Sequence, residues 1–423
     1  CLMVIMATGF AHADEAIKVE IIKNNDGYQL LRNNKPYVIK GAGLEFGDIT
    51  SFVAHGGNAI RNWSTANDVE TAQQVLDKAL ANGVTVSLCL DMGKERWGFD
   101  YNDDKLVAAQ FEKVRAEVLK YRNHPALLTW IIGNELNHSY KNVKVYDAVN
   151  EVSKMIHELD PNHPTTTTLS DLNADVLKVV ETRANDLDFI SFQVYGKLDL
   201  LPKFIAEIGY TKPFMVTEWG AIGYWEMEKT SWGAPVEMNS SEKAKVYLNF
   251  YQTKLKPLNK QIVGSYAFLW GQKQERTPTW FGLFTAAGEE TEAVDVMHYI
   301  WNDRWPDNRS PQLNFMLLDN KRSKQNISLI AGKSYLATVD AMDFEEDILS
   351  YRWEVKPETK AIQEGGDFEH DIENLAILID KPDAATITIK TPSKSGAYRL
   401  FVYVYDNQGH AAHANIPFYV NEQ

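Results

Sequence analysis

Two glutamates stand directly after apolar runs of the sequence. Glu135 closes the segment Trp130-Ile-Ile-Gly-Asn-Glu135, and Glu218 closes Phe214-Met-Val-Thr-Glu218. Surroundings that exclude water raise the cost of an ionised carboxylate, so two carboxyl groups in one pocket can differ in pKa and divide acid and base roles. Cleavage of a glycosidic bond with retention needs such a pair, because one carboxylate attacks the anomeric carbon while the other protonates the leaving oxygen. Either glutamate alone is equally well explained by a structural salt bridge, but the two together favour catalysis.

The elements that must position these glutamates alternate in type along the chain. Between residues 37 and 272, short apolar β-branched runs are separated by amphipathic stretches, which is typical of repeated βα units with a parallel sheet. Strands are predicted at 37–45, 58–64, 85–91, 127–135, 165–170, 189–195, 214–218 and 264–270. Helical spacing of apolar residues is present at 68–82, 104–121, 143–159 and 241–255. Because eight strands close a (β/α)8 barrel, the sequence predicts a TIM barrel.

In such a barrel the carboxyl ends of the strands gather at the face that carries the active site. The residues predicted there are Glu45, Arg61, Trp63, Asp91, Asn134, Glu135, Ser170, Asp171, Gln193, Tyr195, Glu218, Trp219, Trp270 and Gln272. Arg61 and Tyr195 can donate to a carboxylate and orient it, and the Trp270 ring can form a flat floor for a sugar. An ordinary ion pair for Arg61 and a core position for Trp270 are the structural alternatives. Trp97 and His138 fall in predicted loops where they can contact substrate.

The two ends of the sequence differ from the barrel segment in their pattern of apolar and polar residues. The apolar run 1–10 and the Ala11-His12-Ala13 motif resemble the remnant of a signal peptide (residues 1–13), cleaved near Ala13, which predicts a secreted or periplasmic protein; a buried strand is the alternative. A hairpin is expected within 16–40, opening a catalytic barrel domain over 14–308. Residues 309–423 contain six or seven short strand patterns between turn residues and predict an Ig-like β-sandwich.

Composition excludes several classes of function. The net charge of −14, with no basic run, opposes nucleic-acid binding, and no segment has the roughly 20 apolar residues that span a bilayer. Cys1 and Cys89 are the only cysteines, so a disulfide framework or a cysteine metal site is not expected. The glycines at 41, 43 and 47 lack GxGxxG spacing, so no nucleotide cofactor is predicted, and no other cofactor is needed. The acidic run 340–347 is interpreted as a solvated turn in preference to a Ca²⁺ site, and no metal is predicted.

The strand-end residues resemble those of the clan A retaining glycoside hydrolases over roughly residues 28–305. Gly133-Asn134-Glu135 ends the fourth predicted strand and Glu218 ends the seventh. The resemblance implies that Glu135 is the general acid/base, that Glu218 is the nucleophile and that Asn134 hydrogen-bonds a sugar 2-hydroxyl. It also implies substrate-site positions for the matching residues Arg61, Tyr195 and Trp270.

Two further likenesses bear on the substrate. The segments 57–61 and 122–135 resemble the catalytic barrel of glycoside hydrolase family 2, whereas a barrel followed by a single sandwich resembles family 158 endo-β-1,3-glucanases. The preferred expectation is a secreted retaining endo-β-1,3-glucanase acting on β-glucan. The alternatives are an exo-acting β-glycosidase or transglycosylase with the same residues, and a non-catalytic glycan-binding protein. The sandwich is expected to pack on the barrel or to act as a spacer, so that its removal leaves the site chemistry intact.

Overall fold

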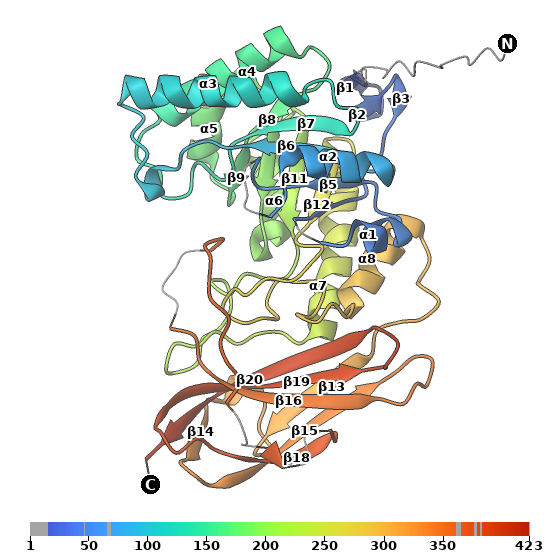
Figure 1. Cartoon of the computed structure of the whole chain (residues 1–423), viewed down its shortest axis with the longest axis vertical. Coiled ribbons are helices and arrows are strands. Elements are labelled where there is room, and N and C mark those ends of the chain that lie inside the picture. The colour runs from blue at the N-terminus through green and yellow to red at the C-terminus, as the bar shows by residue number, and fades with distance from the viewer. Residues whose placement is uncertain are drawn as a thin grey trace, which may run out of the picture. The chain divides into compact units, whose positions relative to one another are not determined.

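The computed structural model describes residues 16–45, 47–65, 69–360, 365–375, 379–380 and 383–422 of the 423-residue chain (Figure 1). The signal peptide predicted over residues 1–13 lies outside these ranges. The chain forms two compact units, and each is described by itself. The first takes in the residues up to Val38, together with Asn62–Leu169 and Asn173–Ser191, and the second takes in Ile39–Arg61, Ser170–Leu172 and the residues from Phe192 onward.

One sheet has the strand order β8-β7-β6-β5-β4-β12-β11-β10-β9. Its strands are β4 (Gly41–Gly43), β5 (Ala59–Arg61), β6 (Thr85–Leu90), β7 (Leu127–Ile132), β8 (Thr165–Thr166), β9 (Thr168–Ser170), β10 (Ile190–Gln193), β11 (Phe214–Trp219) and β12 (Ile262–Ala267). The pairs β4–β5, β6–β7, β7–β8, β11–β12 and β12–β4 are parallel. Strands β8 and β9 stand at the two ends of this strand order, but only Thr167 separates them in sequence. They are therefore two halves of one strand. The prediction of an eight-stranded (β/α)8 barrel is confirmed.

Three helices of the first unit follow the predicted periodicities. These helices are α2 (Ala72–Ala81), α3 (Asp104–Tyr121) and α4 (Lys144–Leu159), and the unit also contains α5 (Ala174–Arg183) and a short 3-10 turn η1 (Glu95–Trp97), for which no helix was predicted. Helix α2 begins four residues later than the predicted start at residue 68, because Thr71 forms a capping box with Gln74. Strands β6 and β7 are buried along their whole length, as parallel strands covered on both faces are.

The hairpin expected within residues 16–40 is present and has a third strand. Strands β1 (Val19–Asn24), β2 (Gly27–Arg32) and β3 (Lys35–Pro36) form an antiparallel sheet. This sheet is attached to the rest of the first unit by hydrogen bonds, since Arg32 Nη2 donates to Pro125 O at 2.7 Å and Val19 N donates to Asn162 O at 2.7 Å. It is therefore an integral part of that unit.

The barrel helices of the second unit are α1 (Ile49–Ala54), α6 (Leu201–Glu207), α7 (Ser240–Phe250) and α8 (Glu292–Asn302). Short helical turns η2 (Gly196–Leu200), η3 (Tyr251–Leu255) and η4 (Lys256–Leu258) lie beside α6 and α7. The predicted helix 241–255 is thus α7 followed by the π-helical turn η3, and Asn239 caps α7 through a capping box with Glu242.

The residues after α8 form two four-stranded sheets, as predicted for a β-sandwich (Figure 1). One has the order β13-β15-β18-β17 and the other β14-β20-β19-β16. The strands are β13 (Gln312–Leu318), β14 (Ile327–Ile330), β15 (Ser334–Met342), β16 (Ser350–Pro357), β17 (Ile379–Asp380), β18 (Thr386–Lys390), β19 (Gly396–Tyr405) and β20 (Ala411–Asn421), with a short turn η5 (Ser323–Gln325). Alternating apolar residues of both sheets, such as Val339 of β15 and Leu400 and Ile416 of β19 and β20, fill the core between them. The domain boundary placed between residues 308 and 309 stays a prediction.

A buried polar network joins the sandwich to the segment that precedes α7. Lys243 Nζ donates to Glu237 Oε1 at 2.5 Å, and Asn415 Nδ2 donates to Glu237 Oε2 at 2.6 Å. Arg399 donates to Pro235 O at 2.8 Å and to Asn415 Oδ1 at 2.7 Å. Because these charged groups are buried and each has a partner, loss of one partner would leave an uncompensated charge in the interior. The sandwich and this part of the barrel are therefore packed as one structure.

Acid should destabilise the protein through His413 in this network. Burial lowers the pKa of His413 to about 3, so the folded chain keeps this ring neutral whereas the unfolded chain protonates it near pH 6.5. The folded-state pKa lies below the unfolded value, so the stabilising contribution is present above pH 6.5 and is lost as the pH falls toward 3. Between pH 7.5 and pH 5 we expect the free energy of unfolding to lose about 2 kcal/mol through this group.

Urea unfolding of wild type and His413→Asn at both pH values measures this contribution. Asp295, whose pKa burial raises to about 6, acts in the opposite direction, so the quantity to follow is the difference between the two proteins. That difference should change by about 2 kcal/mol between pH 7.5 and pH 5. A difference that is the same at both pH values would show that His413 is not the responsible group.

Two expectations based on composition can be compared with the described part of the chain. No helix there is long and apolar enough to cross a membrane. Cys89 lies buried in β6 and is not in a disulfide.

Candidate active site

The carboxylate of Glu218 is held by two side chains from other strand ends of the second unit. Arg61, the last residue of β5, donates from Nη1 to Glu218 Oε1 at 2.6 Å. The hydroxyl of Tyr195, which follows β10, donates to Glu218 Oε2 at 2.8 Å. Arg61 is 0% exposed and Glu218 is 5% exposed, so the guanidinium balances the carboxylate charge away from water. The carboxylate is thus fixed in orientation, because each of its oxygens accepts a hydrogen bond.

Aromatic rings surround the Tyr195 side of this carboxylate. The Tyr195 ring packs against Phe281 at 5.3 Å, Trp225 at 5.6 Å and Phe268 at 5.7 Å between ring centroids. These rings come from the segments that follow β11 and β12. Apolar side chains near a carboxylate lower the local dielectric constant. A lower dielectric constant strengthens the attraction between the carboxylate and a positive charge close to it. Sequence analysis did not select Phe268 and Phe281, because a phenylalanine beside a strand is most often an ordinary core residue.

Glu135 lies in the first unit, in a tight turn after β7. Its φ of +52° is unusual for a residue with a side chain, and the turn is preceded by Gly133 at φ +72°. A Cβ atom on Gly133 would come within 2.6 Å of Leu136, so this position requires glycine. The Glu135 N–H donates to Thr168 Oγ1 at 2.9 Å, and the same hydroxyl donates to Asn134 Oδ1 at 3.4 Å. Thr168 therefore fixes the backbone from which the Asn134 and Glu135 side chains extend.

The sequence of the barrel region matches a known protein family. The model described as "Glycosyl hydrolases family 2, TIM barrel domain" matches residues 48–272, more than half of the chain. The chain belongs to this family. Arg61, Asn134, Glu135, Tyr195 and Glu218 all lie within the matched range.

Solved structures with a similar fold include two β-glucuronidases. The enzyme from Bacteroides uniformis aligns with a TM-score of 0.52 and 14% identity over 96% of this chain and 48% of its own. The β-D-glucuronidase from Dictyoglomus thermophilum aligns with a TM-score of 0.51 and 18% identity over 69% of this chain and 54% of its own. This chain thus spans about half of the length of these proteins, and at these identities the likeness concerns the fold. No match was found among curated protein sequences.

Two tryptophans expected at the substrate face of this family 2 barrel lie in its packed layers, which corrects the prediction. Trp219 is 1% exposed and packs on Tyr247 of α7 at 5.5 Å, because successive side chains of β11 point to opposite faces and Glu218 takes the inner one. Trp270 is also 1% exposed, with its ring against Phe52 of α1 and Trp301 of α8. Neither ring offers a face on which a sugar could stack, so both are core residues.

Three further predicted contact residues of the family 2 barrel, Trp63, Trp97 and His138, lie in the first unit. Trp63 and His138 are half-buried, and the His138 N–H donates to the Glu135 carbonyl at 3.0 Å within the turn after β7. Trp97 in η1 is 64% exposed, and the cationic groups of Lys94 and Arg96 lie 4.6 and 4.8 Å from its ring centre. Trp97 is therefore the most exposed of these three side chains, although two cationic groups lie over its ring.

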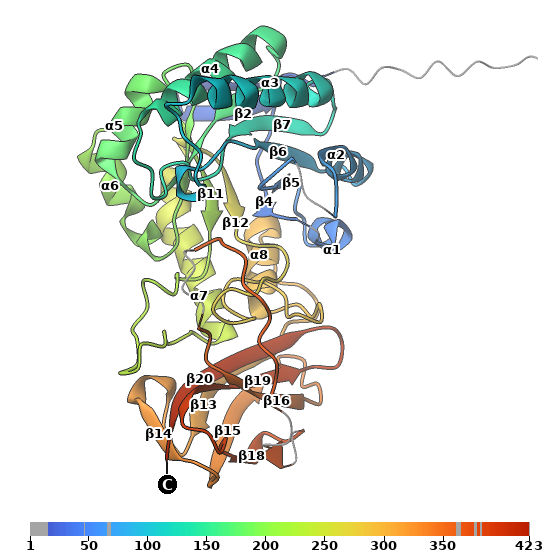
Figure 2. The same ribbon diagram turned by 60° about the vertical axis from the view of Figure 1, so that its left-hand side comes forward.

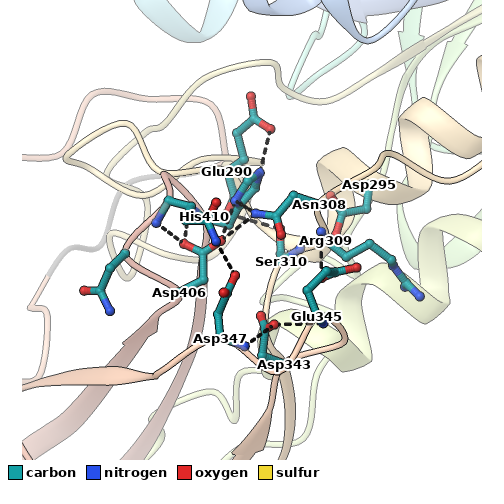
Figure 3. A network of polar contacts seen from close by, with 12 residues as sticks. Glu290, Asp295, Asn308, Arg309, Ser310, Asp343, Glu345, Asp347, Asp406 and His410 are labelled. Carbon is teal, nitrogen blue, oxygen red and sulfur yellow. Dashed lines mark hydrogen bonds and ion pairs between the residues drawn. The ribbon is translucent and has the colours of Figure 1, made fainter.

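The acidic run 340–347 contributes to a group of carboxylates in the sandwich (Figure 3). Asp343, Asp347 and Asp406 each place an oxygen within 4.8 Å of the others, a spacing that could hold a metal ion. Asp406 accepts hydrogen bonds from His410 Nδ1 at 2.6 Å and Asn308 Nδ2 at 2.9 Å. Asp343 and Asp406 are buried, so the interpretation of this run as a fully solvated turn is wrong for Asp343. The hydrogen-bond donors on Asp406 already offset part of the negative charge.

Proposed function

We propose that this protein is a retaining glycoside hydrolase in which Glu218 is the nucleophile and Glu135 the general acid/base. The observation that carries the proposal is the Glu218 carboxylate, which lies at a strand end of a family 2 barrel with Arg61 on one oxygen and Tyr195 on the other. A carboxylate fixed in this way is oriented for attack and stabilised as an anion. An ordinary salt bridge would not need the second donor from a different strand.

In the first step an oxygen of Glu218 attacks the anomeric carbon, and the bond from that carbon to the leaving oxygen breaks. The electron pair of the broken bond stays on the leaving oxygen, which takes the proton of Glu135. The product of this step is a covalent ester between the sugar and Glu218. The hydrogen bond that Thr168 accepts from the Glu135 N–H would hold the acid in place during the transfer.

In the second step the ionised Glu135 removes a proton from water, and the oxygen of that water attacks the anomeric carbon. The bond to Glu218 breaks and its carboxylate is released, again within reach of the Arg61 and Tyr195 donors. Two displacements at the same carbon give overall retention of configuration. Besides the substrate and one water molecule, these steps use the carboxyl groups of Glu135 and Glu218 and the two donors on Glu218.

The proposed substrate is a β-linked glucan, with endo-acting cleavage of β-1,3 linkages as the preferred specificity. The arrangement of one barrel followed by one sandwich supports this specificity, as do the exposed rings of Trp97 and Trp225, at 64% and 48% exposure. An exo-acting β-glycosidase or transglycosylase with the same two glutamates is the alternative. Export of the protein from the cytoplasm stays a prediction.

Product analysis by carbohydrate electrophoresis tests the specificity. Wild type, Glu218→Gln and the control Glu207→Gln, which changes a largely exposed carboxylate on α6, are each incubated with laminarin, mixed-linkage glucan, cellulose and mannan. We expect wild type and the control to release a ladder of oligosaccharides from laminarin and Glu218→Gln to release none.

Other product patterns would change the assignment. Release of monosaccharide alone would support the exo-acting alternative, and aryl β-glucuronides would then be the next substrates, given the names of the two structurally similar proteins. A ladder that persists in Glu218→Gln would exclude Glu218 as the nucleophile.

A further inference from the structure

A loop of the sandwich contacts the two barrel segments that carry the aromatic rings around Glu218. The 365–370 loop lies between β16 and β17, and Figures 1 and 2 both show this part of the chain leaving the sandwich and turning back beside the barrel elements of the second unit. The Gly366 N–H donates to Glu275 Oε1 at 3.3 Å, and Glu369 Oε2 accepts the Arg276 N–H at 2.9 Å. Glu275 and Arg276 belong to the segment that follows β12. The loop is therefore attached to the barrel at two points.

These attachment points are buried and charged. Glu275 is 3% exposed and accepts from Lys273 Nζ at 2.7 Å, and Glu369 is 8% exposed. The Arg276 guanidinium lies over the Tyr224 ring at 4.6 Å. Because buried charges with partners are costly to separate, these contacts hold the loop in a defined position.

The loop also packs on the ring that shields Tyr195. A Cβ atom on Gly365 would lie 3.2 Å from the Trp225 ring, so the backbone approaches this ring closely. Trp225 in turn contacts Tyr224 at 4.9 Å and the Tyr195 ring at 5.6 Å, and the Tyr195 hydroxyl donates to Glu218. An unbroken series of contacts thus connects the sandwich loop with the carboxylate proposed as the nucleophile.

Between its two attachment points the loop exposes a large aromatic side chain. Phe368 is 75% exposed, and its ring lies 4.8 Å from the ring of His370. Trp225 is 48% exposed. An apolar ring on a loop fixed at both sides remains in water at a cost, and rings of this kind offer flat apolar faces to ligands that are polar at one edge and apolar at the other, as sugar rings are.

We propose that the 365–370 loop is part of the glycan-binding site and that Phe368 and Trp225 contact sugar units beyond the one attacked by Glu218. The ligand class is a β-linked glycan of several units. This inference rests on the proposed function and extends it, because the sandwich then contributes to substrate binding. It departs from the expectation that the sandwich can be removed without consequence for the site.

Kinetics on long and short substrates test the inference in the full-length protein. The probes are a β-1,3-linked glucohexaose and an aryl β-glucoside, which occupies only the unit next to Glu218 and the leaving-group position. For Phe368→Ala we expect kcat/KM on the hexasaccharide to fall about 10-fold more than on the aryl glucoside, mainly through a higher KM. Ile348→Ala, which removes another exposed apolar side chain of the sandwich at 88% exposure, is the matched control and should change neither value.

A binding measurement separates failure of this inference from failure of the proposed function. Affinity electrophoresis through laminarin or mixed-linkage glucan compares Glu218→Gln with the double variant Glu218→Gln/Phe368→Ala, and it needs no turnover. Weaker retardation of the double variant would support binding of the glycan by the 365–370 loop, even if the protein has no hydrolytic activity. Equal retardation of the two proteins, no retardation of either, or an equal fall of kcat/KM on both substrates in Phe368→Ala would overturn the inference, whatever the outcome for Glu218.

Discussion

Replacement of Glu218 by alanine is expected to lower the turnover of an activated aryl β-glycoside by about 10⁴-fold or more, because it removes the group that attacks the anomeric carbon. Added azide should restore part of this turnover. The space left by the side chain lies beside the Arg61 guanidinium, which would attract a small anion. Azide then attacks the anomeric carbon, the aryl oxide leaves with the electron pair, and the product is a glycosyl azide of inverted configuration.

The measurement is the initial rate of aryl oxide release with and without azide, with the product identified by NMR. Glu207→Ala, a change at a largely exposed carboxylate of α6, serves as the control for nonspecific effects of the substitution. Rescue by azide would exclude the non-catalytic glycan-binding alternative. Persistence of wild-type turnover in Glu218→Ala would refute the assignment of the nucleophile, and absence of turnover in wild type on every substrate would favour the binding protein.

Replacement of Glu135 by alanine is expected to affect substrates according to their leaving group. A natural glycan has an alkoxide leaving group that needs protonation, so its hydrolysis should fall by about 10³-fold. A dinitrophenyl glycoside has a leaving group that departs without a proton, so its first step should stay within about 10-fold of wild type. The second step lacks its base, and the sugar ester of Glu218 should accumulate.

Burst kinetics and intact-protein mass spectrometry detect that accumulation. Glu151→Ala, at an exposed residue of α4, is the control in the same unit. An equal loss of activity on the glycan and on the dinitrophenyl glycoside would contradict the acid role. Azide should speed release of the sugar from Glu135→Ala with retained configuration, which distinguishes this variant from Glu218→Ala.

The local sequence determined the parts of the fold whose signals are short-range. The apolar runs that became β6, β7 and β11 are buried along their whole length, and that pattern is visible without any knowledge of their neighbours. Counting such runs predicted the barrel, and alternating runs with turn residues predicted the sandwich. The same reasoning placed Glu135 and Glu218 at strand ends. Helix boundaries were less exact, since α2 starts at a capping box that periodicity alone does not reveal.

Only the tertiary structure decided which side chains meet. Arg61 and Glu218 are 157 residues apart in sequence, and their contact depends on how β5 and β11 are arranged in the closed sheet. Whether Trp219 and Trp270 lie in the core or at the substrate face depended on the direction in which each ring points and on the helices that pack against it.

The contacts of the sandwich loop with the barrel segment after β12 were likewise hidden in the sequence. The 365–370 loop has no composition that marks it as part of a site, and its contacts with Glu275 and Arg276 span more than 90 residues. Strand and helix propensities act over a few residues, whereas these contacts form only after distant segments have packed. The sequence by itself therefore determined the elements and the positions of the two glutamates at the ends of their strands, and the packing of those elements decided the environment of each glutamate.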